Sequence, residues 1–178
     1  MGAQMEAAIE ERTDTAGVRP GRKFSGAEVW LHPFDELRLG DSFTSRARTV
    51  TEADVVQFAA LTGDWHPQHT NQVYAEESIF GRRVAHGMLV MAYAIGLVPN
   101  EYVAALRRIR HMVFKHPVFF GDTIHVEGMV VRLREYGPDL GMVTGRWRVV
   151  NQDDVLIMKM ELDALWRRDH PYDDADGD

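Results

Sequence analysis

The spacing of apolar residues changes near the middle of the chain, from a helical period to the alternation typical of strands. Between residues 52 and 62, apolar side chains recur every three or four positions, as on one face of a helix. They are Val55, Val56, Phe58, Ala59 and Leu61. Thr51 precedes this run and Asp54 is the third helical residue, so the two are expected to form a capping box. Residues 42–51 read as a strand before this helix, and residues 72–78 as a short helix after it.

A further helix is predicted at residues 87–96, where apolar residues occupy every side. This pattern indicates a helix that is buried all round. The uncharged run ends at residue 98 and is much shorter than the roughly 20 residues that span a bilayer, so we expect no membrane segment. Residues 64–85 form a long connection of mixed polarity, and such connections in a compact domain are usually functional or disordered.

The second half of the chain predicts four successive antiparallel strands joined by turns, at residues 109–120, 123–134, 142–151 and 155–166. The alternation is clearest in the last strand. Met158, Met160, Leu162 and Ala164 should face one way, and Lys159, Glu161 and Asp163 the other. In the second strand the apolar phase shifts around Gly128, which predicts a bulge and a strongly curved sheet. An apolar helix followed by a curved sheet predicts an α+β fold in which the sheet wraps the helix.

Composition narrows the chemistry that is available to this fold. The chain of 178 residues has no cysteine, which excludes disulfides, thiolate metal sites and cysteine nucleophiles. The net charge is −7, but aspartates near the C-terminus supply much of it and leave the body of the chain almost neutral. We therefore expect a flexible arm at residues 1–27, one domain at 28–167 and an acidic, disordered tail at 168–178.

Charge and the N-terminus also bear on partners and location. The first residues mix acidic and basic side chains without a long apolar core, so they are not read as a secretory signal. We therefore expect a cytoplasmic protein. Because the net charge is negative, we expect no binding to nucleic acid. Two basic clusters, Arg82–Arg83 and Arg107–Arg108 with Arg110, either bind a small phosphorylated ligand or simply solvate the surface.

The densest group of titratable residues lies at Asp64, His66 and His69, between Gly63 and Pro67. Asp64 and His69 form a pair in which one group can take a proton from water while the other orients that water or returns a proton. The alternative is that Asp64 only caps a turn and the histidines only pack. Zinc ligation by this group and His86 is disfavoured, because Pro67 breaks the helical spacing of such ligands, and we expect no metal.

Three motifs in this order resemble one known family. They are the run at residues 58–69, which contains Gly63-Asp64-Trp65-His66-Pro67-Gln68-His69, then Ala85-His86-Gly87-Met88-Leu89, and then Phe114-Lys115-His116-Pro117-Val118 followed by Gly121-Asp122. The combination resembles the MaoC-like dehydratases, the (R)-specific enoyl-CoA hydratases of the hotdog fold. The resemblance covers about residues 34–166.

The resemblance implies a homodimeric hotdog that reversibly hydrates a trans-2-enoyl thioester to the (R)-3-hydroxyacyl thioester. Asp64 and His69 occupy the positions that activate the water, and the Gly87 N–H occupies the oxyanion position at a helix N-terminus. An acyl-CoA is the expected substrate, with no cofactor. His66, Pro67 and His86 are expected to shape the site; Met88, Arg82 and Arg83 are the candidates for substrate contact.

The sequence departs from the family pattern at two places, since His66 replaces an asparagine and Ile95 a serine that some members carry. Trp65 is expected to anchor its loop. Met91, Tyr93, Trp147 and Trp166 are expected in the core. Two other functions remain open at this point: a hotdog thioesterase, in which water attacks the carbonyl carbon, and a non-catalytic acyl-thioester-binding subunit.

Overall fold

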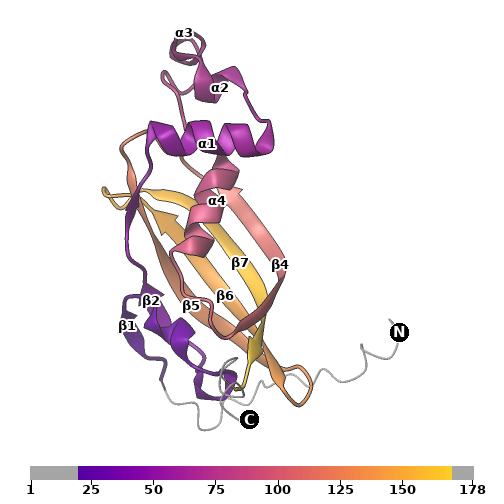
Figure 1. The fold of residues 1–178 in the computed structure, drawn as a ribbon. Helices are drawn as coiled ribbons and strands as arrows, with labels where there is room; N and C mark the ends of the chain where they lie inside the picture. The colour runs from indigo at the N-terminus through magenta and orange to yellow at the C-terminus, as the bar shows by residue number, and fades with distance from the viewer. Residues whose placement is uncertain (1–19, 170–178) are drawn as a thin grey trace.

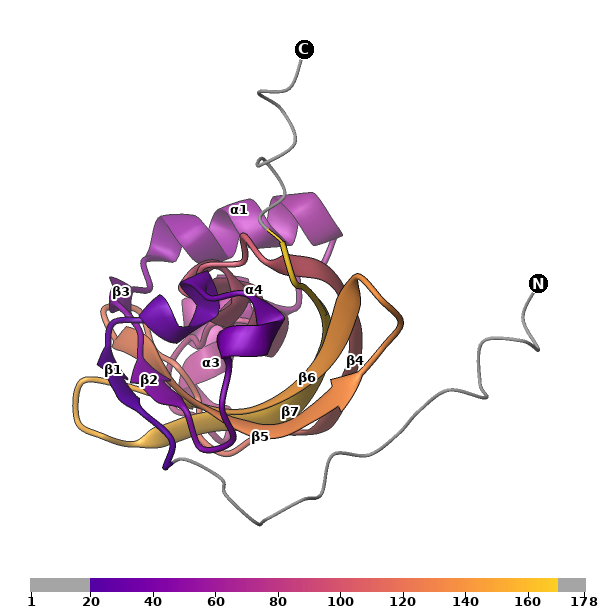
Figure 2. The same ribbon diagram turned by 90° about the horizontal axis from the view of Figure 1, so that it is seen from below.

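The computed structural model describes residues 20–169, which form a curved sheet with a helix along its concave face (Figure 1). The elements in chain order are β1 (Lys23–Ser25), the 3-10 helices η1 (Glu28–Leu31) and η2 (Phe34–Glu36), β2 (Ser42–Thr44), β3 (Arg48–Thr49), α1 (Glu52–Thr62), α2 (Pro67–Thr70), α3 (Gln72–Glu76), α4 (Gly87–Gly96), β4 (Val103–Phe114), β5 (Thr123–Glu135), β6 (Leu140–Val150) and β7 (Leu156–Arg167). The sheet has the order β1-β2-β5-β6-β7-β4, and β3 also pairs with β5. Seen from below, the strands curve round α4 (Figure 2). The predicted α+β class, with a sheet wrapped round a helix, is confirmed.

Helix α4 is buried on the side that faces the sheet. Leu89, Val90, Met91 and Ala94 are buried in one apolar cluster with side chains of β5 and β7. Met88, however, keeps 54% of its surface exposed. The prediction of a helix buried all round is therefore wrong for the described chain, because the sheet of one chain covers a single side of the helix.

Strands β5, β6 and β7 lie close to their predicted bounds, and β5 alternates over its first half, whereas residues 141–145 of β6 are all buried. Trp147 of β6 and Trp166 of β7 are buried as expected, and the Trp166 ring lies 4.6 Å from that of Trp30, which comes from η1. Asp163 was expected to face outward into solvent but is only 3% exposed. It is buried because Thr144 donates a hydrogen bond of 2.7 Å to its carboxylate and Arg110 one of 2.8 Å, which satisfies the charge.

Strand pairing is where sequence periodicity was least reliable. The first strand of the second half runs from Val103 to Phe114, not over residues 109–120, and it pairs with β7 instead of its successor β5. Residues 42–51 form two short strands, β2 and β3, which both pair with β5. The irregularity expected around Gly128 falls between Val130 and Arg132. Gly128 instead makes room for Phe43, whose ring would lie 2.1 Å from a Cβ at that position.

Part of the predicted flexible arm belongs to the domain. Lys23–Ser25 form β1, which pairs in parallel with β2, and Arg22 donates to the fully buried Asp41 at 2.6 Å. Hydrogen bonds and an ion pair therefore tie residues 22–25 to the sheet, and the boundary expected at residue 27 is wrong. Residues 1–19 and 170–178, which include most of the predicted tail, lie outside the described residues. Within residues 20–169, no helix is long and apolar enough to cross a membrane.

The capping box that begins α1 is present as predicted. Thr51 Oγ1 accepts from the Asp54 N–H at 3.3 Å, and the Asp54 carboxylate accepts from the Thr51 N–H at 2.8 Å. Arg48 also donates to Asp54 at 3.0 Å, and its guanidinium lies 3.9 Å from the ring of Tyr93, which is half-buried. Burial by itself raises the pKa of Asp54, but hydrogen bonds from Tyr93, Thr51 and Arg48 outweigh it and lower this pKa to about 2.

Asp54→Asn is expected to lower the free energy of unfolding near neutral pH by about 1 kcal/mol, because the amide keeps the cap but loses the charge. Because the folded-state pKa lies below the usual 3.8, this contribution is complete above pH 3.8 and is lost as the pH falls toward 2. Urea unfolding of both proteins between pH 6 and 2.5 should show the difference shrinking below pH 3.8. Asp139→Asn, at an exposed turn, serves as the control. A difference that stays constant with pH would contradict the prediction.

Candidate active site

The candidate site begins where α1 ends. Gly63 closes the helix in the left-handed conformation, with φ of 78°, and its N–H donates to the Ala59 carbonyl at 2.8 Å. A side chain would be strained at this φ, so glycine suits the stop. The chain then turns, and Asp64 follows as the first residue of the connection. Trp65, which was expected to anchor this loop, is 53% exposed.

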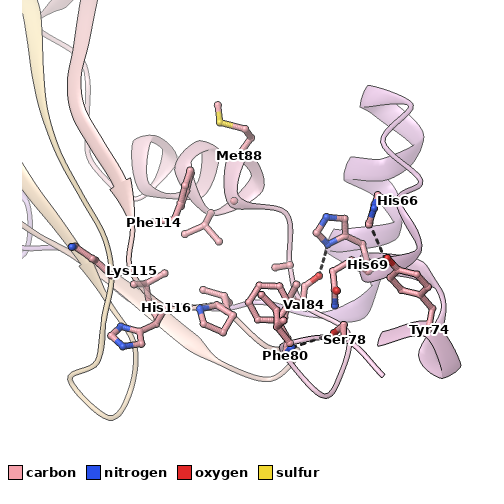
Figure 3. A pocket seen from close by; sticks show the side chains of 18 of the residues that line it. His66, His69, Tyr74, Ser78, Phe80, Val84, Met88, Phe114, Lys115 and His116 are labelled. Carbon is pink, nitrogen blue, oxygen red and sulfur yellow. Dashed lines mark hydrogen bonds between the residues drawn. The ribbon is translucent and has the colours of Figure 1, made fainter. Parts of the chain in front are cut away.

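Helix α2 is a single turn that sequence periodicity did not reveal. It begins at Pro67, whose fixed φ suits the first helical position and whose missing N–H costs nothing there. His66 is its N-cap, and the His66 Nδ1 accepts a hydrogen bond from the Gln68 N–H at 3.1 Å. His66, which stands in place of the asparagine of the family pattern, thus supplies a different hydrogen-bond acceptor at the N-cap of α2. The result is that His69, on the same turn, faces the cleft (Figure 3).

A hydrogen bond from Nδ1 holds the His69 ring in place. The His69 Nδ1–H donates to the Val84 carbonyl at 2.7 Å, and no hydrogen bond from residues 20–169 engages Nε2. Burial lowers the pKa of His69 below its usual value of 6.5, and the neighbouring His86 and His66 lower it further, although the Val84 bond and Asp64 act in the opposite direction. At neutral pH the ring is therefore neutral, and Nε2 presents a lone pair.

His86 connects the Asp64 loop to the start of α4. It is 3% exposed, and its Nε2–H donates to the main-chain carbonyl of Asp64 at 3.0 Å. Its ring stacks on that of His69, with 3.8 Å between centroids, and contacts Phe58 of α1 at 5.1 Å. Its Nδ1 is buried without a hydrogen-bond partner among the described residues. These contacts give His86 a structural role in holding together the segments that carry Asp64, His69 and Gly87.

The Asp64 carboxylate lies close to both imidazoles. It is about half exposed, at 52%, and it accepts from the His66 N–H at 3.3 Å. One of its oxygens and one nitrogen each of His69 and His86 lie within 4.8 Å of one another. One water molecule can bridge groups up to about 5.6 Å apart, since each hydrogen bond is about 2.8 Å long. The separation therefore fits a single water held between Asp64 and His69.

The same three side chains are poorly arranged for zinc. His69 Nδ1 and His86 Nε2 each donate to a carbonyl, and the two rings are stacked with 29° between their planes. An imidazole lone pair lies in the plane of its ring, so rings stacked 3.8 Å apart hold their lone pairs in separate, nearly parallel planes, whereas tetrahedral zinc needs lone pairs that point at one atom. The geometry favours water at this position, and the expected absence of a metal stays a prediction.

Gly87 is the first residue of α4, directly after His86. The first N–H groups of a helix have no acceptor within the helix and carry its positive dipole, so the Gly87 N–H can bind a developing negative charge. A Cβ on Gly87 would lie 3.0 Å from the ring of Phe114, so even a small side chain would press on that ring. Glycine keeps this helix end open to an approaching group.

His66, His69 and Gly87 line a cleft of about 820 Å³ between α2–α3, the start of α4 and the end of β4 (Figure 3). Asp64 and His86 are not among its lining residues and lie behind His69, within 4.8 Å of one of its ring nitrogens. Residues that sequence reasoning had not assigned to a site also line the cleft: Gln68, Tyr74, Glu77, Ser78, Ile79, Phe80, Val84, Ala85, Val90, Phe114, Lys115, His116, Pro117, Val118 and Ile157. The run Phe114–Val118 had been noticed only as a motif. Two adjacent apolar residues in a polar connection, Ile79 and Phe80, are a sequence signal of a binding surface. In the structure Ile79 is 93% exposed, which fits that signal.

Of the three candidates for substrate contact, Met88 lines the cleft. Arg82 and Arg83 do not: the Arg82 guanidinium lies 3.5 Å from the ring centroid of Phe119, and Arg83 forms an ion pair of 2.6 Å with Glu52 of α1. Both arginines thus contact other parts of the protein, and a role in binding substrate stays a prediction for them.

Comparison with solved structures identifies the fold. A solved structure from Mycobacterium tuberculosis described as a double hotdog fold superposes with a TM-score of 0.72, at 21% identity, over 77% of this chain and 44% of that one. A monoamine oxidase regulatory protein from Archaeoglobus superposes with a TM-score of 0.73, at 33% identity, over 85% of this chain and 99% of that one. The fold is a hotdog.

The family follows from the sequence comparison. The family model described as the MaoC-like domain matches residues 37–151, so the chain belongs to the MaoC-like dehydratase family. Protein MaoC of Klebsiella aerogenes is 42% identical over 103 residues, which are 54% of this chain but only 31% of that protein. An (R)-specific enoyl-CoA hydratase of Rhodospirillum rubrum is 34% identical over 102 residues, 56% of this chain and 70% of the relative. The chain thus spans under a third of the first relative and over two thirds of the second.

Proposed function

We propose that this protein reversibly hydrates a trans-2-enoyl-CoA to the (R)-3-hydroxyacyl-CoA. The observation that carries the proposal is that the Asp64 carboxylate lies within 4.8 Å of a ring nitrogen of His69, a gap that fits one water, while the bond from His69 Nδ1 to Val84 leaves Nε2 as the ring's lone-pair nitrogen. Relatives described as (R)-specific enoyl-CoA hydratases support it. His86 links both groups to the start of α4, since it stacks on His69, donates to the Asp64 carbonyl and directly precedes Gly87.

In the proposed reaction, one water supplies both the hydroxyl group added to C3 and the hydrogen added to C2. His69 Nε2 accepts one hydrogen of the water and orients it, while Asp64 takes the other proton as the water oxygen bonds to C3. The electron pair of the C2–C3 double bond moves toward the thioester carbonyl. The protonated Asp64 then gives its proton to C2 on the same face, which regenerates the carboxylate and completes the addition of water.

Negative charge develops on the thioester oxygen during this step. We assign its stabilisation to the Gly87 N–H, because a preorganised donor at a helix N-terminus strengthens its hydrogen bond as the enolate forms. The acyl chain would lie in the cleft, whose walls carry the apolar side chains of Met88, Phe80 and Phe114. No cofactor enters the proposed reaction.

We also propose that the functional unit is a homodimer. Strand β4 is the last strand of the sheet order, and its apolar residues Leu106, Ile109, Val113 and Phe114 are between 36% and 46% exposed. These residues and the exposed Met88 of α4 are apolar side chains that a second copy, packed along this edge of the sheet, would cover.

Incubation with crotonyl-CoA tests the proposal directly. Loss of the conjugated enoyl thioester, followed by ultraviolet absorbance, should occur without release of free thiol and should give the (R)-3-hydroxy product by chiral chromatography. A series of longer 2-enoyl-CoA substrates in the same assay covers the acyl chain length. Thiol release at the same rate would contradict the proposal and favour a thioesterase. Acyl-CoA binding without turnover of any member of the series would favour a non-catalytic subunit.

A further inference from the structure

We propose that His66 is a proton-sensitive positioning residue, which holds the catalytic turn in place only while its ring is neutral. The inference rests on the proposed hydratase function and adds a mode of control to it. The family asparagine at this position has no such property, because an amide does not titrate.

The contacts of His66 link it to both proposed catalytic residues. Its Nδ1 accepts from the Gln68 N–H at 3.1 Å, and its carbonyl accepts from the His69 N–H at 2.9 Å. Its own N–H donates to the Asp64 carboxylate at 3.3 Å. Helix α2 has four residues, so the bond from Gln68 is one of very few that define the turn. Loss of this cap would loosen the segment that fixes the distance between Asp64 and His69.

The cap depends on the charge state of the ring. Neutral imidazole has one nitrogen that accepts a hydrogen bond, and in His66 that nitrogen is Nδ1, since its partner is a main-chain N–H. A proton on Nδ1 would set two N–H donors against each other and convert the bond into a repulsion. Histidine is the side chain that ordinarily changes charge between pH 5 and 8. The ring is exposed to solvent, so protons have direct access to it.

Titratable groups of both signs surround the ring. Within its own segment are Asp64 and His69, whose ring lies 6.2 Å away, and on α3 is Tyr74, whose ring packs edge-on at 5.9 Å. The other groups around the cleft are Glu77, after α3, His86, before α4, and Lys115 and His116, after β4. Among the described residues, none forms a hydrogen bond or ion pair with the His66 Nε2.

The test compares His66→Asn with His66→Ala and the wild type in the crotonyl-CoA assay between pH 5 and 9. At every pH the asparagine variant, which keeps a cap, should have a kcat about fivefold above that of the alanine variant, the effect of a cap worth about 1 kcal/mol. Relative to the wild type, the loss in the alanine variant should be about fivefold at pH 8 and should disappear toward pH 5.5. Between pH 8 and 5.5 the wild type should lose about fivefold more activity than His66→Asn. His32→Asn, directly after η1, where the ring contacts Glu36 and Phe24 and does not line the cleft, should keep the wild-type profile.

A second measurement does not depend on activity. In proton–nitrogen correlation spectra without substrate, the Gln68 amide of the wild type should shift as the pH falls from 8 to 5, and the same amide in His66→Asn should not. An unchanged acid limb in His66→Asn, or a Gln68 amide that ignores pH in the wild type, would overturn the proposal. Equal losses in the asparagine and alanine variants at every pH would do the same. If no enoyl-CoA is hydrated, the spectra still decide whether the cap is proton-sensitive.

Discussion

Asp64→Asn is expected to lower kcat for crotonyl-CoA hydration about 1,000-fold or more while leaving the fold intact. Asparagine has the same shape, and its side-chain oxygen can still accept the bond from the His66 N–H, now 3.3 Å long. It cannot take a proton from water or return one to C2, which are the two tasks assigned to the carboxylate. Removal of a general acid or base typically costs 10²- to 10⁴-fold, and here one group would lose both roles. Initial rates and a far-ultraviolet circular dichroism spectrum of each protein make the measurement.

The control for this variant removes a carboxylate of the same region without touching the proposed chemistry. Glu76 is exposed on α3, does not line the cleft, and accepts a hydrogen bond from Gln72 at 2.9 Å. Glu76→Gln should retain kcat within about twofold, as expected for a surface change. If Asp64→Asn kept more than a tenth of the wild-type kcat, Asp64 would not be the base, and the carboxylate would be assigned to the structure of the turn.

His69→Asn is expected to lower kcat about 100-fold or more. The asparagine nitrogen can take the place of Nδ1 and still donate to the Val84 carbonyl, which now accepts from His69 at 2.7 Å. The variant therefore tests the free Nε2, which is absent from asparagine, separately from the contact that positions the ring. The expected reduction in kcat reflects two losses, the orientation of the water and the lone pair of Nε2 that accepts its hydrogen. The KM for crotonyl-CoA should change much less than kcat, because His69 is assigned to the water and not to the thioester.

The pH dependence supplies a further check on His69. Because burial lowers its pKa below 6.5, the ring stays neutral and active to lower pH than an exposed histidine would. In the His66→Asn background, the remaining acid limb of kcat should therefore have its midpoint below pH 6.5, and it should vanish when His69→Asn is added. His32→Asn again removes an imidazole away from the site and should leave kcat unchanged. A limb that persists without His69 would contradict the assignment.

The arrangement of the site explains why its residues were partly visible in the sequence. The run from Gly63 to His69 concentrates the titratable groups within one short segment, so their proximity needs no long-range folding. The interactions that orient them are different. His69 donates to the carbonyl of Val84 and His86 donates to that of Asp64, across separations of 15 and 22 residues. Main-chain carbonyls have no residue-specific signature, so no sequence pattern could identify these partners.

The sequence by itself determined the features that depend on neighbouring residues. The capping box at Thr51 and Asp54, the bounds of α4 between Gly87 and Gly96, and the long alternating strands are all set by local spacing, because side chains three to four residues apart on a helix, or two apart on a strand, share a face. Only the tertiary structure decided that β4 pairs with β7, that residues 22–25 join the sheet, and that one side of α4 stays open. Pairing and burial depend on which distant surfaces meet when the sheet curves, and one strand pattern is compatible with several neighbours. For the same reason, the chemistry proposed for Asp64 and His69 could be inferred from the sequence, whereas the hydrogen bond by which His66 caps α2 is evident only in the folded turn.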